Sequence, residues 1–95
     1  MRKTFVVAYD VADAKRLSRI ARICGDFGNR LQKSVFICSM NDAELEMLVV
    51  RARKCIDKEQ DQVVIIRLPP VSENELAVQA LGKPYVAEER TAIIV

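Results

Sequence analysis

A short apolar run near the start of the chain, residues 5–11 (FVVAYDV), places the tightest constraint on the fold. Its length and β-branched content favour a buried strand over a helix. Because successive side chains of a strand point to opposite faces, Phe5 and Tyr9 share one face, and Ala8 and Asp10 share the other. Both faces are apolar up to Asp10. The run is therefore predicted to lie in the middle of a sheet, with one carboxylate at its end.

Asp10 has two interpretations. It could be a capping residue for the helix that follows, acting with Asp13 three residues later. Alternatively, it is a functional carboxylate placed where the chain leaves the core. The run of residues 5–11 does not decide between the two.

The composition narrows the possible chemistry. A chain of 95 residues makes one small domain, and oligomerisation is a natural way for so small a domain to complete its core. The sequence contains no histidine, which excludes Ser-His and Cys-His nucleophile systems and a histidine-ligated zinc. The net charge of +2 is too small to indicate an anionic partner by itself. An enzyme of this composition would use carboxylates, basic residues and a hard metal ion.

The cysteines and the hydropathy indicate the compartment. There are three cysteines, Cys24, Cys38 and Cys55, and none belongs to a CxxC pair. An odd number without paired spacing favours reduced thiols over a disulfide framework. No signal-type segment and no membrane-spanning run is recognised. We therefore expect a cytoplasmic protein with no membrane partner.

A first amphipathic helix is predicted after Asp13. Its apolar stripe is formed by Leu17, Ile20, Ala21 and Cys24. The opposite side is basic and carries Lys15, Arg19 and Arg22, with Arg16 at the margin. This basic side is either ordinary solvated surface or a contact surface for nucleic acid.

Residues 30–38 are predicted to form the second strand. In a single strand Arg30, Gln32, Ser34 and Phe36 would share one face. A face of polar side chains with one aromatic is typical either of a nucleic-acid surface or of a half-solvated sheet.

The rest of the chain continues the alternation. Asn41 and Glu44 form a capping-box pattern before a second helix that ends near residue 54 or 55. A third strand follows over residues 63–68, and two prolines stop it. Helix and strand compete over residues 76–81, whereas the apolar residues 91–95 should pair as a strand. From periodicity the order is strand, helix, strand, helix, strand, with one or two late strands.

Two segments carry a family resemblance. Residues 6–11 (VVAYDV) and residues 28–36 (GNRLQKSVF), together with the basic helix between them, resemble the CRISPR-associated "Cas two" family of the spacer-acquisition machinery. The resemblance covers the first two thirds of the chain, and the motifs occur in the expected order and spacing.

The resemblance implies an α+β fold, a ferredoxin-like antiparallel sheet with two helices on one face, over a single domain of residues 1–95. It also implies a homodimer formed sheet face to sheet face, in which each chain adds a C-terminal strand to its partner's sheet. Residues 69–95, with the late strands, are then expected at the dimer interface.

The resemblance also assigns site residues. It implies that Asp10 is the catalytic residue and the metal ligand, with Mg²⁺ as the cofactor and Mn²⁺ as a substitute. The resemblance also implicates Arg16, Arg19, Arg30 and Phe36. With Lys15 and Arg22 from the basic side of the helix, the residues expected to bind nucleic acid are Lys15, Arg16, Arg19, Arg22 and Arg30, and those expected to support the site are Tyr9, Ser34 and Phe36. Lys33 and the pair Ile37-Cys38 depart from the family pattern.

Two functions are consistent with this resemblance. The first is a dimeric metal-dependent endonuclease that cleaves RNA or DNA and bridges the CRISPR integrase. The second is a non-catalytic dimeric adaptor that supports the integrase and protospacer DNA, and only the role of Asp10 separates the two. An unrelated ferredoxin-like regulatory dimer is a third interpretation.

Overall fold

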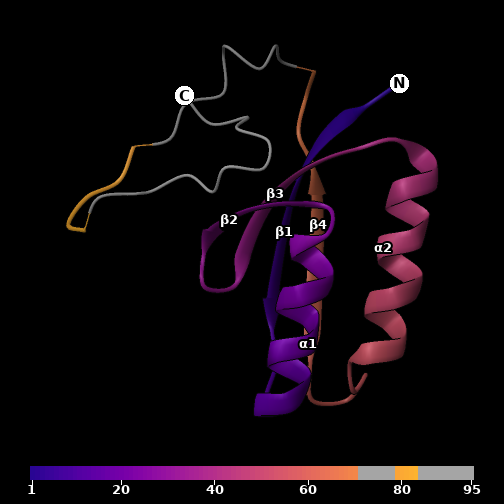
Figure 1. The fold of residues 1–95 in the computed structure, drawn as a ribbon, viewed down its shortest axis with the longest axis vertical. Coiled ribbons are helices and arrows are strands. Elements are labelled where there is room, and N and C mark those ends of the chain that lie inside the picture. The colour runs from indigo at the N-terminus through magenta and orange to yellow at the C-terminus, as the bar shows by residue number, and fades with distance from the viewer. Residues whose placement is uncertain (71–78, 84–95) are drawn as a thin grey trace.

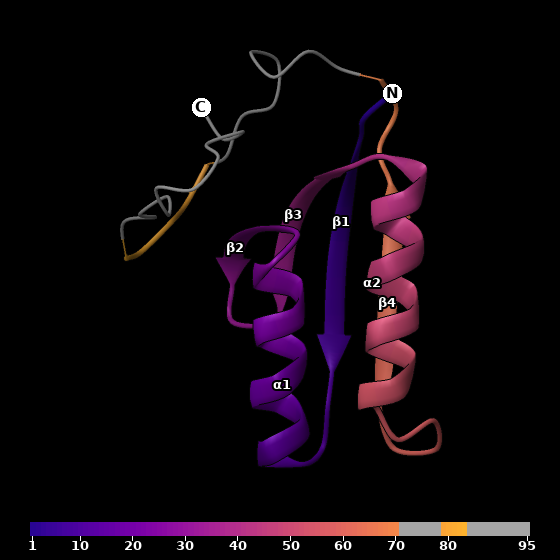
Figure 2. The same cartoon turned by 45° about the vertical axis from the view of Figure 1, so that its right-hand side comes forward.

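The computed structural model describes residues 1–70 and 79–83 of the chain. Its elements, in order, are β1 (Lys3–Asp10), α1 (Ala14–Gly25), β2 (Gly28–Gln32), β3 (Val35–Met40), α2 (Asp42–Cys55) and β4 (Gln62–Arg67). The strands form one four-stranded sheet in the order β2-β3-β1-β4, and every pairing is antiparallel. Both helices cover the same face of this sheet (Figures 1 and 2). The predicted α+β, ferredoxin-like fold is confirmed.

Strand β1 is central, as residues 5–11 predicted. It pairs with β3 on one side and with β4 on the other. Phe5, Val7 and Tyr9 are buried in the core under the helices, and the residues between them belong to the opposite face. That core continues with Ile20 and Cys24 of α1 and Leu48 and Ala52 of α2. The alternation leaves Asp10 exposed at the end of β1.

The prediction of one strand over residues 30–38 was wrong. A turn at Lys33 and Ser34 divides this segment into the hairpin β2–β3, with an irregular register near Gln32. Arg30 consequently stands opposite Phe36. In a single strand the two residues would be about 20 Å apart, whereas in the hairpin they are neighbours on one face.

The helix caps follow the sequence patterns. In α2 the Asn41 side chain accepts a hydrogen bond from the Glu44 amide, and Glu44 accepts one from the Asn41 amide. In α1 the N-cap is Asp13, whose carboxylate accepts hydrogen bonds from the Lys15 and Arg16 amides. The interpretation of Asp10 as a capping residue is therefore wrong, because Asp13 alone fills that role.

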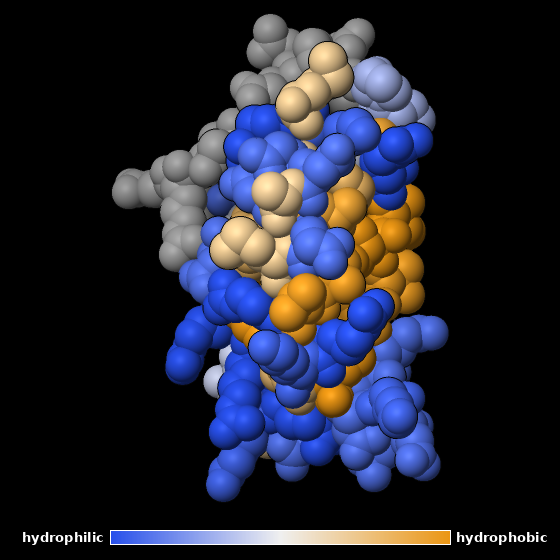
Figure 3. Space-filling view, turned by 90° about the vertical axis from the view of Figure 1, so that its right-hand side faces the viewer, coloured by the Kyte–Doolittle hydropathy of each residue, from blue (hydrophilic) through white to orange (hydrophobic). Residues whose placement is uncertain are grey.

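The side of the sheet without helices is partly apolar. Val64 and Ile66 of β4 are 40% and 51% exposed, and they stand opposite Ala8 and Val6 of β1. Figure 3 views the molecule from the side of α2 and shows hydrophobic residues among hydrophilic ones on its surface. Residues 76–81, where helix and strand compete in the sequence, and the predicted strand over residues 91–95 lie mostly outside the described residues, so the predicted strand exchange stays a prediction.

Neither helix in the described part of the chain has the length and apolar character that crossing a bilayer would need.

Candidate nucleic-acid and metal site

A groove lies at the end of β1, between α1 and the β2–β3 hairpin. Its lining comes from three parts of the chain: Tyr9, Asp10 and Val11; Ala14, Leu17, Ser18 and Ala21; and Arg30, Lys33 and Ser34. The groove thus brings together four residues expected at the site, namely Tyr9, Asp10, Arg30 and Ser34. It adds Lys33, which sequence reasoning treated only as a departure from the family pattern. Because Arg30 and Lys33 are cationic, the groove suits a phosphate.

Leu17 belongs to this groove rather than to the core. It was predicted to continue the apolar stripe of α1, but its side chain is 42% exposed, while Ile20 and Cys24 are fully buried. The stripe is therefore narrower than its spacing suggested. Leu17 gives the groove an apolar wall opposite the cations of the hairpin.

Two stacked aromatic rings form the support of the groove. Tyr9 and Phe36 lie with their ring centroids 6.1 Å apart and their planes at 30°. The Tyr9 hydroxyl donates a hydrogen bond of 2.8 Å to the Lys33 carbonyl oxygen, which fixes the hairpin turn to β1. The Arg30 guanidinium lies over the Phe36 ring, with Cζ 5.2 Å from its centroid. Because Phe36 is buried, its ring supports Arg30 rather than offering a surface to a base.

Asp10 is the carboxylate of the groove. It is the last residue of β1, stands opposite Gln62 of β4 and is exposed. Among the described residues, no hydrogen bond or ion pair joins its side chain to another group. A carboxylate held on a central strand, but not used by the fold, is available for a ligand.

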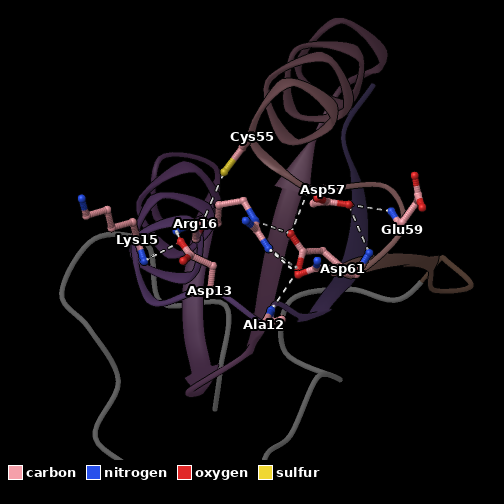
Figure 4. A network of polar contacts seen from close by, with 9 residues as sticks. Ala12, Asp13, Lys15, Arg16, Cys55, Asp57, Glu59 and Asp61 are labelled. Carbon is pink, nitrogen blue, oxygen red and sulfur yellow. Dashed lines mark hydrogen bonds and ion pairs between the residues drawn. The ribbon is translucent and has the colours of Figure 1, made fainter.

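Arg16 points away from this groove toward a second carboxylate. Its Nε donates to Asp61 Oδ2 at 2.7 Å, and its Nη2 donates to Asp61 Oδ1 at 3.3 Å (Figure 4). Asp61 Oδ1 also accepts from the Ala12 amide at 2.9 Å, and Oδ2 accepts from the Asp57 amide at 2.8 Å. The Arg16 hydrogen bond and these amides hold the pKa of Asp61 well below its usual range, while Asp61 raises the pKa of Arg16.

Asp61 was missed by sequence reasoning. It lies in a polar loop before β4, and no motif distinguishes it from the other acidic residues there. Each of its carboxylate oxygens already accepts two hydrogen bonds, and its side chain is 0% exposed. It is therefore not a second metal ligand beside Asp10.

The basic side of α1 is separate from the groove. Lys15, Arg19 and Arg22 are exposed and lie on the side of the helix opposite the buried Ile20 and Cys24. They do not line the groove around Asp10. One chain therefore carries two cationic surfaces, one on α1 and one on the hairpin.

The residues present fit one kind of metal site. In the described part of the chain no cluster of three metal-ligating side chains exists, and Asp10 is the carboxylate that the groove offers. Mg²⁺ usually takes only one or two carboxylates and completes its shell with waters and phosphate oxygens. Asp10 thus fits a metal that binds together with a phosphate. Cys24 and Cys38 are buried in the core and do not line the groove, so neither is a ligand there, and burial raises the pKa of both thiols to about 12.

Comparison with known proteins gives one consistent family. The profile of the family described as CRISPR associated protein Cas2 matches residues 3–75. A protein of Moorella thermoacetica named CRISPR-associated endoribonuclease Cas2 1 is 47% identical over 68 residues, which cover 66% of this chain and 71% of that protein. A protein of the same name from Rhodospirillum rubrum is 35% identical over 91 residues, covering 96% of this chain and 89% of that protein.

Solved structures agree in fold. The crystal structure of a hypothetical protein from Thermus thermophilus has a TM-score of 0.76 and 32% identity, covering 93% of this chain and 100% of that one. The crystal structure of Streptococcus pyogenes Cas2 at pH 6.5 has a TM-score of 0.72 and 33% identity, covering 83% of this chain and 99% of that one.

Proposed function

Since this chain belongs to the CRISPR associated protein Cas2 family, we propose that it is a metal-dependent endonuclease of CRISPR spacer acquisition that cleaves phosphodiester bonds in RNA or DNA. The observation that carries the proposal is the exposed Asp10, which shares a groove with the cations Arg30 and Lys33. The relatives from Moorella thermoacetica and Rhodospirillum rubrum are named endoribonucleases, and a relative from Thermus thermophilus is named an endonuclease.

The groove residues have three different proposed roles: metal binding, phosphate binding and positioning. Asp10 would hold Mg²⁺ or Mn²⁺, and a metal held there would supply an activated water and charge stabilisation at a phosphodiester. Arg30 and Lys33 hold backbone phosphates, which positions a nucleic acid without reading its sequence. Tyr9 fixes the hairpin turn through the Lys33 carbonyl, so that Arg30 and Asp10 keep their relative placement.

The proposed active form is a homodimer. One chain supplies one groove carboxylate, and a second copy would supply another near a two-fold axis. The exposed Val64 and Ile66 on the helix-free face support such a contact. In the cell the dimer would bridge copies of the CRISPR integrase.

A non-catalytic adaptor is the second candidate. The observation in its favour is the separation of Lys15, Arg19 and Arg22 from the groove. A basic surface away from Asp10 can hold a protospacer duplex without any cleavage. In that function Asp10 would be dispensable.

Substitution of Asp10 separates the two functions. Purified wild-type and Asp10→Asn proteins are compared on RNA and on duplex DNA with Mg²⁺, with Mn²⁺ and with a chelator. The control is Asp42→Asn, an exposed carboxylate in the first turn of α2. The proposed endonuclease function predicts that Asp10→Asn and the chelator each abolish cleavage, whereas Asp42→Asn retains it.

Spacer acquisition in cells completes the comparison. Equal cleavage by wild type and Asp10→Asn would indicate a contaminating nuclease and remove the proposed activity. Lost cleavage with intact acquisition would make the adaptor role the one that matters in the cell.

A further inference from the structure

The ion pair between Arg16 and Asp61 joins three parts of the fold next to Asp10. Arg16 belongs to the first turn of α1, Asp61 to the loop before β4, and the Ala12 amide that Asp61 binds lies two residues after Asp10 (Figure 4). We infer that Arg16 and Asp61 are a positioning pair that holds the β1–α1 connection, residues 11–13, and that Arg16 makes no phosphate contact. The part of this inference that concerns activity rests on the proposed endonuclease function.

The contacts of Arg16 leave little of it for a phosphate. Its guanidinium binds both oxygens of Asp61 and also donates to Gln60 Oε1 at 3.4 Å, and its side chain is 23% exposed. Binding a phosphate would leave the Asp61 carboxylate, which is 0% exposed, without its countercharge. Breaking a buried pair by removing one partner is strongly unfavourable. The charge of Arg16 is therefore already paired with the Asp61 carboxylate inside the protein.

The connection between β1 and α1 is held at each of its residues. Val11 is 9% exposed, the Ala12 amide donates to Asp61, and the Asp13 carboxylate caps α1. Asp61 also accepts from the Asp57 amide, which anchors the loop after α2 to the same carboxylate. Because Ala12 is so close in sequence to Asp10, the direction in which the chain leaves β1 depends on Asp61, and Asp61 in turn depends on Arg16.

Amide hydrogen exchange, followed by NMR, tests the positioning role without any activity. Arg16→Gln does not touch the Ala12 amide, yet exchange at Ala12 and Asp57 should become at least tenfold faster, as it should in Asp61→Asn. The control Arg19→Gln removes an exposed cation of the same helix and should leave both rates unchanged. Unchanged rates at both amides in Arg16→Gln would overturn the inference.

The salt dependence of binding tests the absence of a phosphate contact. Affinity for a DNA duplex is measured against salt concentration, because each lost phosphate contact lowers the slope of log K against log salt by about 0.9. Arg16→Gln should keep the wild-type slope. A loss in Arg16→Gln of about 0.9 would show that Arg16 contacts phosphate and overturn the inference.

A second variant keeps the test decisive if Arg16→Gln folds poorly. Arg16→Lys retains the charge but loses the two-pronged geometry with Asp61. It should give exchange rates at Ala12 between those of wild type and Asp61→Asn, with the wild-type slope. Wild-type exchange in Arg16→Lys would show that the fork is not needed and would contradict the inference.

Steady-state cleavage connects the pair to Asp10. Arg16→Gln and Asp61→Asn should each lower kcat about 10- to 100-fold with little change in KM. The kcat of the double variant should be no lower than that of the less active single variant. Additive losses in the double variant would mean that Arg16 acts independently of Asp61. If the wild-type protein does not cleave, the proposed function fails, whereas exchange and salt slope still decide the positioning inference.

Discussion

Arg30 and Phe36 stand opposite each other in the β2–β3 hairpin, and the guanidinium carbon of Arg30 lies 5.2 Å from the centroid of the Phe36 ring. A cation over an aromatic face is attracted by the ring quadrupole. The Phe36 ring is buried and stacked on Tyr9. It therefore holds the exposed Arg30 side chain in a defined position at the rim of the groove.

Removing the aromatic face under Arg30 should weaken nucleic-acid binding. Phe36→Leu keeps an apolar core residue but loses the cation–π contact, which is worth about two- to fivefold in affinity. The matched control is Phe27→Leu, since Arg51 lies over the Phe27 ring at 5.5 Å, away from the groove. Equal affinities for the two variants in fluorescence anisotropy titrations would contradict the role of Phe36.

A negative charge in the wall of the groove should repel a phosphate backbone. Leu17→Glu places a carboxylate opposite Arg30 and Lys33, and we expect affinity to fall about three- to tenfold at low salt and less at high salt. Val50→Glu is the control, because Val50 has nearly the same exposure, 40% against 42%, but lies on α2. A loss of affinity as large in Val50→Glu would show that overall charge, rather than the groove, sets the effect.

Asp61 should make the protein sensitive to acid. Its pKa is lower in the folded chain than in the unfolded chain, so its contribution to stability is present above about pH 4 and is lost as the pH falls below that value. We expect Asp61→Asn to lower the urea midpoint of unfolding at pH 6. Between pH 6 and pH 2.5 the midpoint of this variant should then decrease less than the midpoint of the wild type. A variant that is less stable at pH 6 but keeps the wild-type slope would contradict this assignment, and Asp42→Asn serves as a surface control.

Two glycines should respond oppositely to alanine. A Cβ at Gly28 would lie 2.8 Å from Cys38 Cα, and closer still to the Ile37 carbonyl oxygen and Cys38 Sγ, because β2 and β3 approach closely there. Gly28→Ala should therefore lower the free energy of unfolding by about 1–3 kcal/mol. At Gly25, in the last turn of α1, a Cβ meets nothing within 4 Å, so Gly25→Ala should raise it by about 0.5–1 kcal/mol. Thermal unfolding compares the two directly.

The helix-free sheet face should carry the proposed dimer contact. Ile66→Lys places a charge on that face and should weaken self-association about tenfold or more. Met47→Lys, on the exposed side of α2, is 55% exposed in the wild type and should leave association unchanged. Sedimentation equilibrium measures both, and a folded wild-type monomer at micromolar concentration would remove the dimer proposal.

Local periodicity was enough for much of the fold. The two-sided apolar run with Asp10 at its tip predicted a central strand, and the capping box at Asn41 and Glu44 predicted the start of α2 within one residue. These predictions depend only on interactions between residues close in sequence or on a strand's alternation. The candidate residues Tyr9, Asp10, Arg30 and Ser34 came from motifs, and the structure gathers them in one groove.

The remaining features depend on contacts that no local pattern records. The turn at Lys33 and Ser34 contains no glycine, proline or asparagine, and only Lys33 interrupts the alternating apolar residues Leu31, Val35 and Ile37, so the pairing of β2 with β3 is what reveals the hairpin. Asp61 is 45 residues from Arg16, and their pairing exists because α1 and the loop before β4 meet in space. Sequence by itself determined β1, the two helices, β4 and the carboxylate that β1 carries outward, because local patterns encode them. Tertiary packing decided the β2–β3 hairpin, and with it which arginine faces the groove and which is held inside the fold.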